Sequence, residues 1–102
     1  MKLIIATCLK EYQKTVEAIF REAKIKVFSV TSTVGNKNEQ ALELLDNWFA
    51  SGEEHFDSIV LFSFTGNENA IKAIELVKKH NLDTPSDFPI RAFLLSVEQS
   101  SH

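Results

Sequence analysis

The feature that most constrains the fold is a pair of short apolar runs in which polar residues do not alternate. Leu3–Leu9 and Ile59–Phe64 each have the length of one strand. In the second run Leu61 points to one side of a strand, while Val60 and Phe62 point to the other. A sheet with helices on one face normally alternates apolar and polar residues when its other face meets water. These runs therefore predict that both faces are covered, and self-association of the subunits is the favoured way to cover the second face.

Helical and strand patterns follow one another along the rest of the chain. The first half of the chain predicts a strand at Leu3–Leu9, a helix at Glu11–Lys24, a strand at Ile25–Val34 and a helix at Asn38–Ser51. The polar stretch Glu53–Ser58 then leads to a strand at Ile59–Phe64 and a further helix. A loop at Asn81–Phe88 and a strand at Ile90–Val97 complete the predicted order. Gly35 and Asn36 are predicted to end the second strand. Thr65 and Glu68 are predicted to form a capping box that begins the last helix. This order predicts one α+β domain over residues 1–102, a ferredoxin-like βαββαβ sandwich with an extra helix between the second and third strands.

Composition narrows the class of protein. The 102 residues are 44% hydrophobic and 25% charged with a net charge of −3, which is typical of a globular domain. Lys and Arg form no basic stripe, so no nucleic-acid binding is expected. The single cysteine, Cys8, fits a reducing compartment, and no run is long enough to span a membrane. We therefore expect a cytoplasmic protein that is not inserted in a membrane and carries no cofactor.

The second and last predicted strands carry a resemblance to the PII signal-transduction superfamily. The segment Ser29–Gly35 (SVTSTVG) resembles the strand that leads into the T-loop of PII proteins, and Ile90–Gln99 is similar to their last strand. The resemblance implies a homotrimer and places Asn36–Ser58 at the position of the T-loop, although the periodicity of this segment predicts a helix. The loop Leu82–Pro89 lacks the glycines and lysine with which PII proteins hold nucleotide phosphates. We therefore expect ATP to bind weakly or not at all.

The chain also resembles, more loosely, the trimeric CutA proteins that are implicated in tolerance of divalent metals. The similar segments are Trp48–Gly52 (WFASG) and His80–Pro85 (HNLDTP). This resemblance gives the alternative function, a divalent-metal-binding protein. Glu54 and His55 are the candidate ligands, because carboxylate and imidazole suit such ions. A solvated loop that follows a helix is the simpler interpretation of the same residues.

Two further groups are candidate binding residues. Thr31, Ser32, Thr33 and Gly35 stand at the end of a predicted strand and form the candidate effector site. They are also compatible with an ordinary edge strand. The aromatic residues Trp48 and Phe49, in the T-loop position, form the candidate surface for a partner protein, and the alternative is that they pack in the core.

Catalysis has little support in the sequence. Cys8 and Ser63 have no histidine near them in sequence, and a cysteine within a strand is more often a packing residue than a nucleophile. The segment Leu9–Tyr12 lacks the arginine and glycine that an acylphosphatase-type phosphate loop needs. The PII resemblance instead implies a non-enzymatic regulator that senses a small effector at clefts between subunits. It implies a protein partner such as a membrane transporter.

Overall fold

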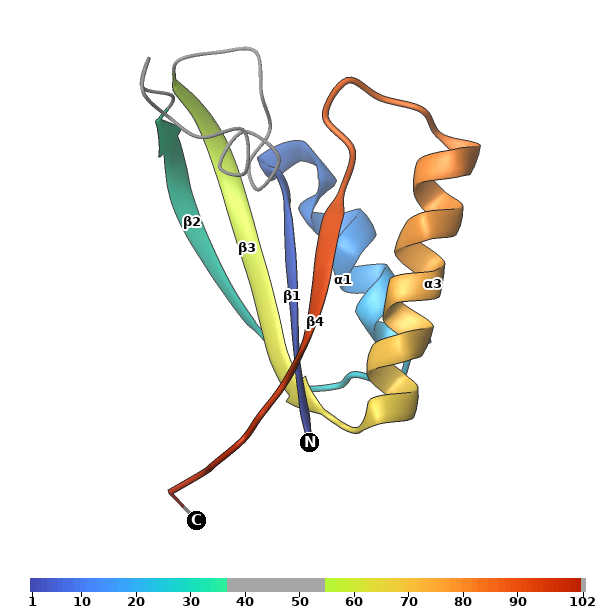
Figure 1. The fold of residues 1–102 in the computed structure, drawn as a ribbon. Coiled ribbons are helices and arrows are strands. Elements are labelled where there is room, and N and C mark those ends of the chain that lie inside the picture. Colours follow the sequence, from blue (N-terminus) through green and yellow to red (C-terminus); the bar gives the residue numbers. More distant parts are fainter. Residues whose placement is uncertain (37–54, 102) are drawn as a thin grey trace.

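The computed structural model describes residues 1–36 and 55–101, which form one four-stranded sheet with two helices against one of its faces (Figure 1). The strands are β1 (Lys2–Leu9), β2 (Ser29–Asn36), β3 (His55–Thr65) and β4 (Arg91–Ser96). They lie in the order β2-β3-β1-β4, and every neighbouring pair is antiparallel. The predicted ferredoxin-like α+β fold is confirmed. The described elements follow the expected βαββαβ order. The predicted helix Asn38–Ser51 lies outside the described residues.

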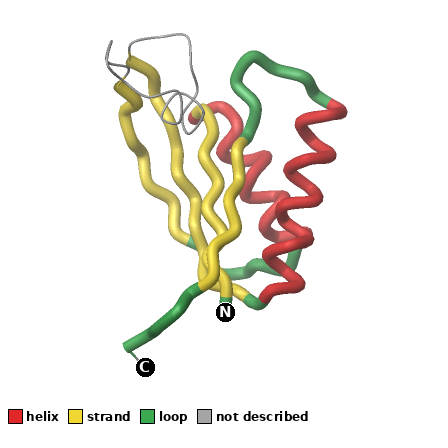
Figure 2. Tube along the Cα trace, in the orientation of Figure 1, coloured by secondary structure: helices red, strands yellow, loops and turns green. Residues whose placement is uncertain are grey.

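Two helices cross between the strands, and both lie on the same side of the sheet (Figure 2). A short 3-10 turn, η1 (Lys10–Tyr12), leads into α1 (Gln13–Glu22), and α3 (Asn67–Asp83) joins β3 to β4. No helix in the described part of the chain is long and apolar enough to cross a membrane.

The core lies between the two helices and the face of the sheet that they cover. Alternate residues in the central parts of β1 and β3 enter it, because side chains alternate along a strand. The largest fully buried side chains are Phe20, Ile4, Ile25, Ile59, Leu61 and Val16. Phe20 also meets Phe28 edge to face, with ring centroids 5.4 Å apart. The apolar spacing in the sequence thus placed α1 correctly against the sheet.

The boundaries of β2 differ from the prediction at both ends. The strand begins at Ser29 rather than Ile25, because α1 ends in a tight turn at Lys24, whose φ is 65°, and the Ile25 amide then donates to the Phe20 carbonyl. Ile25 is buried as the residue that closes this turn. At the other end Gly35 and Asn36 do not break the strand, since they pair with Phe56 and His55 of β3.

The ends of β3 and α3 also differ from the prediction. Strand β3 begins at His55, inside the stretch expected to be polar loop. The capping box is wrong, because Thr65 is the last residue of β3 and the N-cap is Gly66, with no side-chain hydrogen bond. Helix α3 runs on to Asp83 through part of the predicted loop.

The loop between α3 and β4 is tied to the sheet by one amide side chain. Asn81 donates from Nδ2 to the Ile90 carbonyl at 2.8 Å and accepts at Oδ1 from the Ile90 amide at 3.2 Å. Both backbone groups of Ile90 are therefore satisfied just before β4 begins.

Candidate functional site

A cavity of about 270 Å³ opens where β2 and β3 pair, near the beginning of η1. Its lining includes two consecutive cross-strand pairs, Ser32 with Ile59 and Thr33 with Ser58. Lys10 of η1 and Asp57 of β3 complete the lining. Because β1 and β3 are antiparallel, the end of β1 lies beside the beginning of β3, and this brings Lys10 to the cavity (Figure 1).

The charged groups of this cavity are unpaired within the described residues. Lys10 and Asp57 are both exposed, and neither forms a hydrogen bond or an ion pair with a described residue. The cavity therefore offers one cation and one anion to a bound molecule.

The hydroxyl groups of the cavity differ in their remaining hydrogen-bonding capacity. Ser58 is buried and donates its proton to the Cys8 carbonyl at 3.1 Å, so its oxygen remains only an acceptor. Ser32 is exposed and Thr33 is half-buried. The hydroxyls of both are available as donors and as acceptors.

The structure brings together only part of the predicted effector site. Ser32 and Thr33 line the cavity, whereas Thr31 does not and only makes a long contact of 3.4 Å with the Ser32 carbonyl. Gly35 lies in β2 opposite Phe56, beyond the cavity lining. Sequence reasoning did not include Lys10, Asp57 or Ser58 in this site. The signal that could have found them is the ferredoxin-like strand order, which places the ends of β1 and β2 on either side of the beginning of β3.

Most of the predicted partner-binding and metal-binding residues are not among the described residues. Trp48, Phe49 and Glu54 lie outside the described residues, and His55 is described only as the first residue of β3. Among residues 1–36 and 55–101, no group of three or more His, Cys, Asp and Glu side chains could hold a metal ion.

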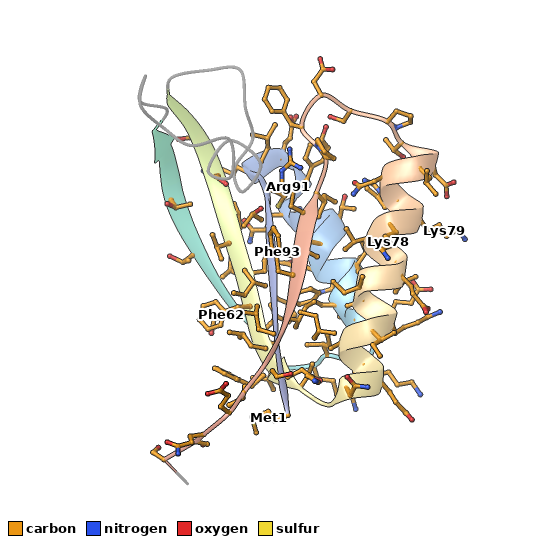
Figure 3. The ribbon with its side chains drawn as sticks, viewed as in Figure 1. Met1, Phe62, Lys78, Lys79, Arg91 and Phe93 are labelled. Atoms are coloured by element: carbon orange, nitrogen blue, oxygen red, sulfur yellow. The ribbon has the colours of Figure 1, made fainter. Side chains whose placement is uncertain are left out.

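The sheet face opposite the helices is largely apolar, and we call it the helix-free face. Cross-strand pairs place Leu3 with Phe64 and Leu95, and Ile5 with Phe62 and Phe93. Phe64 is 58% exposed and Leu95 45% exposed. Figure 3 shows Phe62 and Phe93 on their strands, away from Lys78 and Lys79 on α3. Neither described helix covers this face.

Arg91 carries a charge on the helix-free face. It pairs with Thr7 across β1 and β4, and Thr7 pairs with Val60 across β1 and β3, so the three residues lie in one row. Its Nε is buried and has no hydrogen-bond partner among the described residues. A buried donor without an acceptor is costly, so this nitrogen needs an acceptor that the described residues do not provide.

The two candidate nucleophiles, Cys8 and Ser63, are both buried. Cys8 is buried in the core, and this burial raises the pKa of its thiol to about 11, so the reactive thiolate is scarce at neutral pH. Ser63 is buried and donates to the Val27 carbonyl at 2.6 Å, which ties β3 to the connection before β2. The interpretation of Cys8 as a packing residue agrees with its burial in the core.

Comparison with known proteins bears on the fold. The sequence matches no protein-family model and no curated protein. A crystal structure from Thermus thermophilus, described as that of a candidate PII-like signalling protein, superposes with a TM-score of 0.62 at 12% identity, over 91% of this chain and 82% of that chain. The fold is PII-like. The resemblance expected from Ser29–Gly35 and Ile90–Gln99 is thereby confirmed at the level of the fold.

The PII-like fold gives the cavity a defined place in the topology. The two strands beside it, β2 and β3, are the ones that residues 37–54 connect. Ser32 and Thr33 come shortly before this connection, and Asp57 and Ser58 shortly after it. A ligand in the cavity would therefore contact both strands next to the connecting segment.

Proposed function

We propose that this chain is a non-enzymatic regulatory protein that binds a small effector in the cavity between β2 and β3 and acts on a partner protein. The observation that carries the proposal is the cavity itself, with Lys10 and Asp57 unpaired among the described residues and three hydroxyl-bearing residues beside them. The PII-like fold supports it, since the similar crystal structure is described as that of a signalling protein. The high pKa of Cys8 and the hydrogen bond of Ser63 support a non-catalytic role.

We propose that the subunits form a homotrimer through the helix-free face. Burial of apolar surface contributes about 25 cal/mol per Å², so covering the exposed rings and side chains of this face favours association. An interface that is largely apolar and includes an arginine is typical of stable oligomers.

The proposed partner contact involves residues 37–54, with Trp48 and Phe49 as its aromatic side chains. They occupy the position of the T-loop in the PII resemblance, and the cavity lies at the two ends of this segment. A cytoplasmic protein that acts on a membrane transporter is the partner relationship implied by that resemblance. The metal-binding alternative gains no support from the described residues, which contain no cluster of ligands.

Native mass spectrometry of protein purified without chelator tests the proposal. We expect a trimer that retains a small organic molecule, and light scattering should give the same subunit count at micromolar concentration. A stable monomer across that range would refute the assembly. A trimer that retains no small molecule, and that no metabolite stabilises against heat, would refute effector binding.

The nucleotide expectation is tested separately by titration calorimetry with ATP. The loop before β4 has no glycine or lysine between Leu82 and Pro89. The Asn81 side chain also holds the end of this loop against Ile90. We expect no heat of binding at micromolar concentrations, and micromolar affinity would show that the loop can receive phosphates.

A further inference from the structure

We infer that the effector is a small zwitterion, a free α-amino acid or a close analogue, bound in the cavity between β2, β3 and η1. This inference rests on the proposed regulatory function and names the chemical class of its ligand. It depends on three properties of the cavity, namely its size, its charges and the placement of its hydrogen-bonding groups.

The size of the cavity favours a small metabolite. Its volume of about 270 Å³ lies just below the range of about 300–1,000 Å³ that drug-sized ligands occupy. A nucleoside triphosphate, with its base, ribose and three phosphates, needs more space than this. An amino acid fits, and Ile59 provides an apolar wall for its carbon atoms.

The charges of the cavity favour a ligand that carries both signs. Lys10 and Asp57 line the same space, and neither is neutralised by a described residue. A simple anion would be attracted by Lys10 but repelled by Asp57. A simple cation would be attracted by Asp57 but repelled by Lys10. A zwitterion satisfies both groups at once, and charge-assisted hydrogen bonds are the strongest that such a site can make.

The strand register decides which polar groups share the ligand. Ser32 pairs with Ile59, and side chains alternate along a strand, so Ser32 lies on the same face of the sheet as Ile59 and Asp57. Ser58 lies on the other face and has used its only proton on the Cys8 carbonyl. Lys10 can only donate and Ser32 can donate as well, so these two suit a carboxylate, whereas Asp57 only accepts and suits an ammonium group. The cavity therefore offers the donors and the acceptor that an amino acid requires.

The first experiment measures binding to the purified protein. The probes are the proteinogenic L-amino acids, each added singly at millimolar concentration in thermal-shift assays, and calorimetry then gives the affinity of the best one. Its N-acetyl derivative lacks the ammonium charge, and its carboxamide lacks the carboxylate. We expect each derivative to bind about tenfold to a hundredfold more weakly, the usual value of a charged hydrogen bond.

Charge-removing variants assign each group of the ligand to a side chain. Lys10→Met should weaken binding of the amino acid and abolish its advantage over the carboxamide. Asp57→Asn should abolish its advantage over the N-acetyl derivative. The matched controls Lys14→Met and Asp87→Asn remove exposed charges that do not line the cavity, and they should leave both preferences unchanged.

The outcomes separate this inference from the proposed function. Equal affinity for the amino acid and both derivatives, or preferences that survive in Lys10→Met and Asp57→Asn, would overturn the zwitterion assignment. If no amino acid binds but native mass spectrometry finds another retained molecule, the zwitterion is wrong and the regulatory proposal stands. If neither is found, both are wrong.

Discussion

The two faces of the sheet are built from the same strands but meet different surroundings. On the helix side, Ile4 and Leu61 are fully buried, and Phe20 of α1 closes over them. On the helix-free face, Phe64 remains 58% exposed in the subunit. Both faces are apolar, yet only one is completed within the described residues. The difference shows that apolar strand composition can serve folding on one face and association on the other.

Substitutions on the two faces should differ in their effect on the stability of the subunit. The helix side should respond as a packed core, where each lost contact lowers the free energy of unfolding. The helix-free face should respond mainly through assembly, so its effects should depend on protein concentration.

The largest effect is expected for Phe20→Ala. This ring is fully buried and meets Phe28 edge to face, so its removal leaves a cavity. The free energy of unfolding should fall by about 3–5 kcal/mol, measured by urea denaturation at fixed protein concentration. Ile71→Ala, at a position that is 42% exposed on α3, is the control and should cost far less. Equal losses for the two would contradict the assignment of the core.

The next effect is a loss of stability at alkaline pH that depends on Cys8. The unfolded thiol ionises near its ordinary pKa of 9.0, whereas burial raises the pKa of the folded thiol to about 11. Between these two pH values the unfolded state binds fewer protons than the folded state. The contribution of the Cys8 thiol to the free energy of unfolding is therefore fully present below pH 9.0 and is lost as pH rises toward about 11. The loss attributable to Cys8 should be about 2–3 kcal/mol.

Comparison with Cys8→Ala isolates this contribution from the titration of other groups. Urea denaturation of both proteins across the alkaline range should give a steeper decline for the wild type. Parallel curves would show that the thiol is not protected by the helix side of the sheet.

A smaller effect is expected for Ser63→Ala. The hydroxyl joins β3 to the Val27 carbonyl at 2.6 Å, so the substitution removes one hydrogen bond between β3 and the connection before β2. The expected loss is about 1 kcal/mol, measured by thermal denaturation. Thr31→Ala on exposed β2 serves as the control and should change stability by less than about 0.5 kcal/mol.

The smallest effect on the isolated subunit is expected for Phe64→Lys. Its side chain is exposed, so the subunit should keep its fold, and far-ultraviolet circular dichroism should be unchanged. Light scattering should nevertheless show dissociation, because a lysine would bring a charge into the proposed interface. Ile71→Lys on the opposite side of the molecule should remain assembled. Dissociation of both variants, or of neither, would contradict the assignment of the interface to the helix-free face.

The sequence was sufficient for the order of elements and for the apolar character of both faces. Periodicity found α1, and the apolar runs found β1 and the central part of β3, because burial imposes a period on local sequence. The ends of the strands and helices were less predictable than their central parts. Gly35 and Asn36 are typical of a strand end, yet pairing with β3 keeps both in β2. Thr65 fits a capping box by residue type, but it is used as the last residue of a strand.

The candidate site shows which features local sequence does not predict. The sequence by itself determined that small hydroxyl residues lie in the second strand, and Ser32 and Thr33 do line the cavity. Only the tertiary structure decided that Lys10 and Asp57 join them, although these residues are far apart in the chain. The physical reason is that antiparallel pairing brings the end of β1 to the beginning of β3, and such long-range pairing leaves no period in the sequence of either strand.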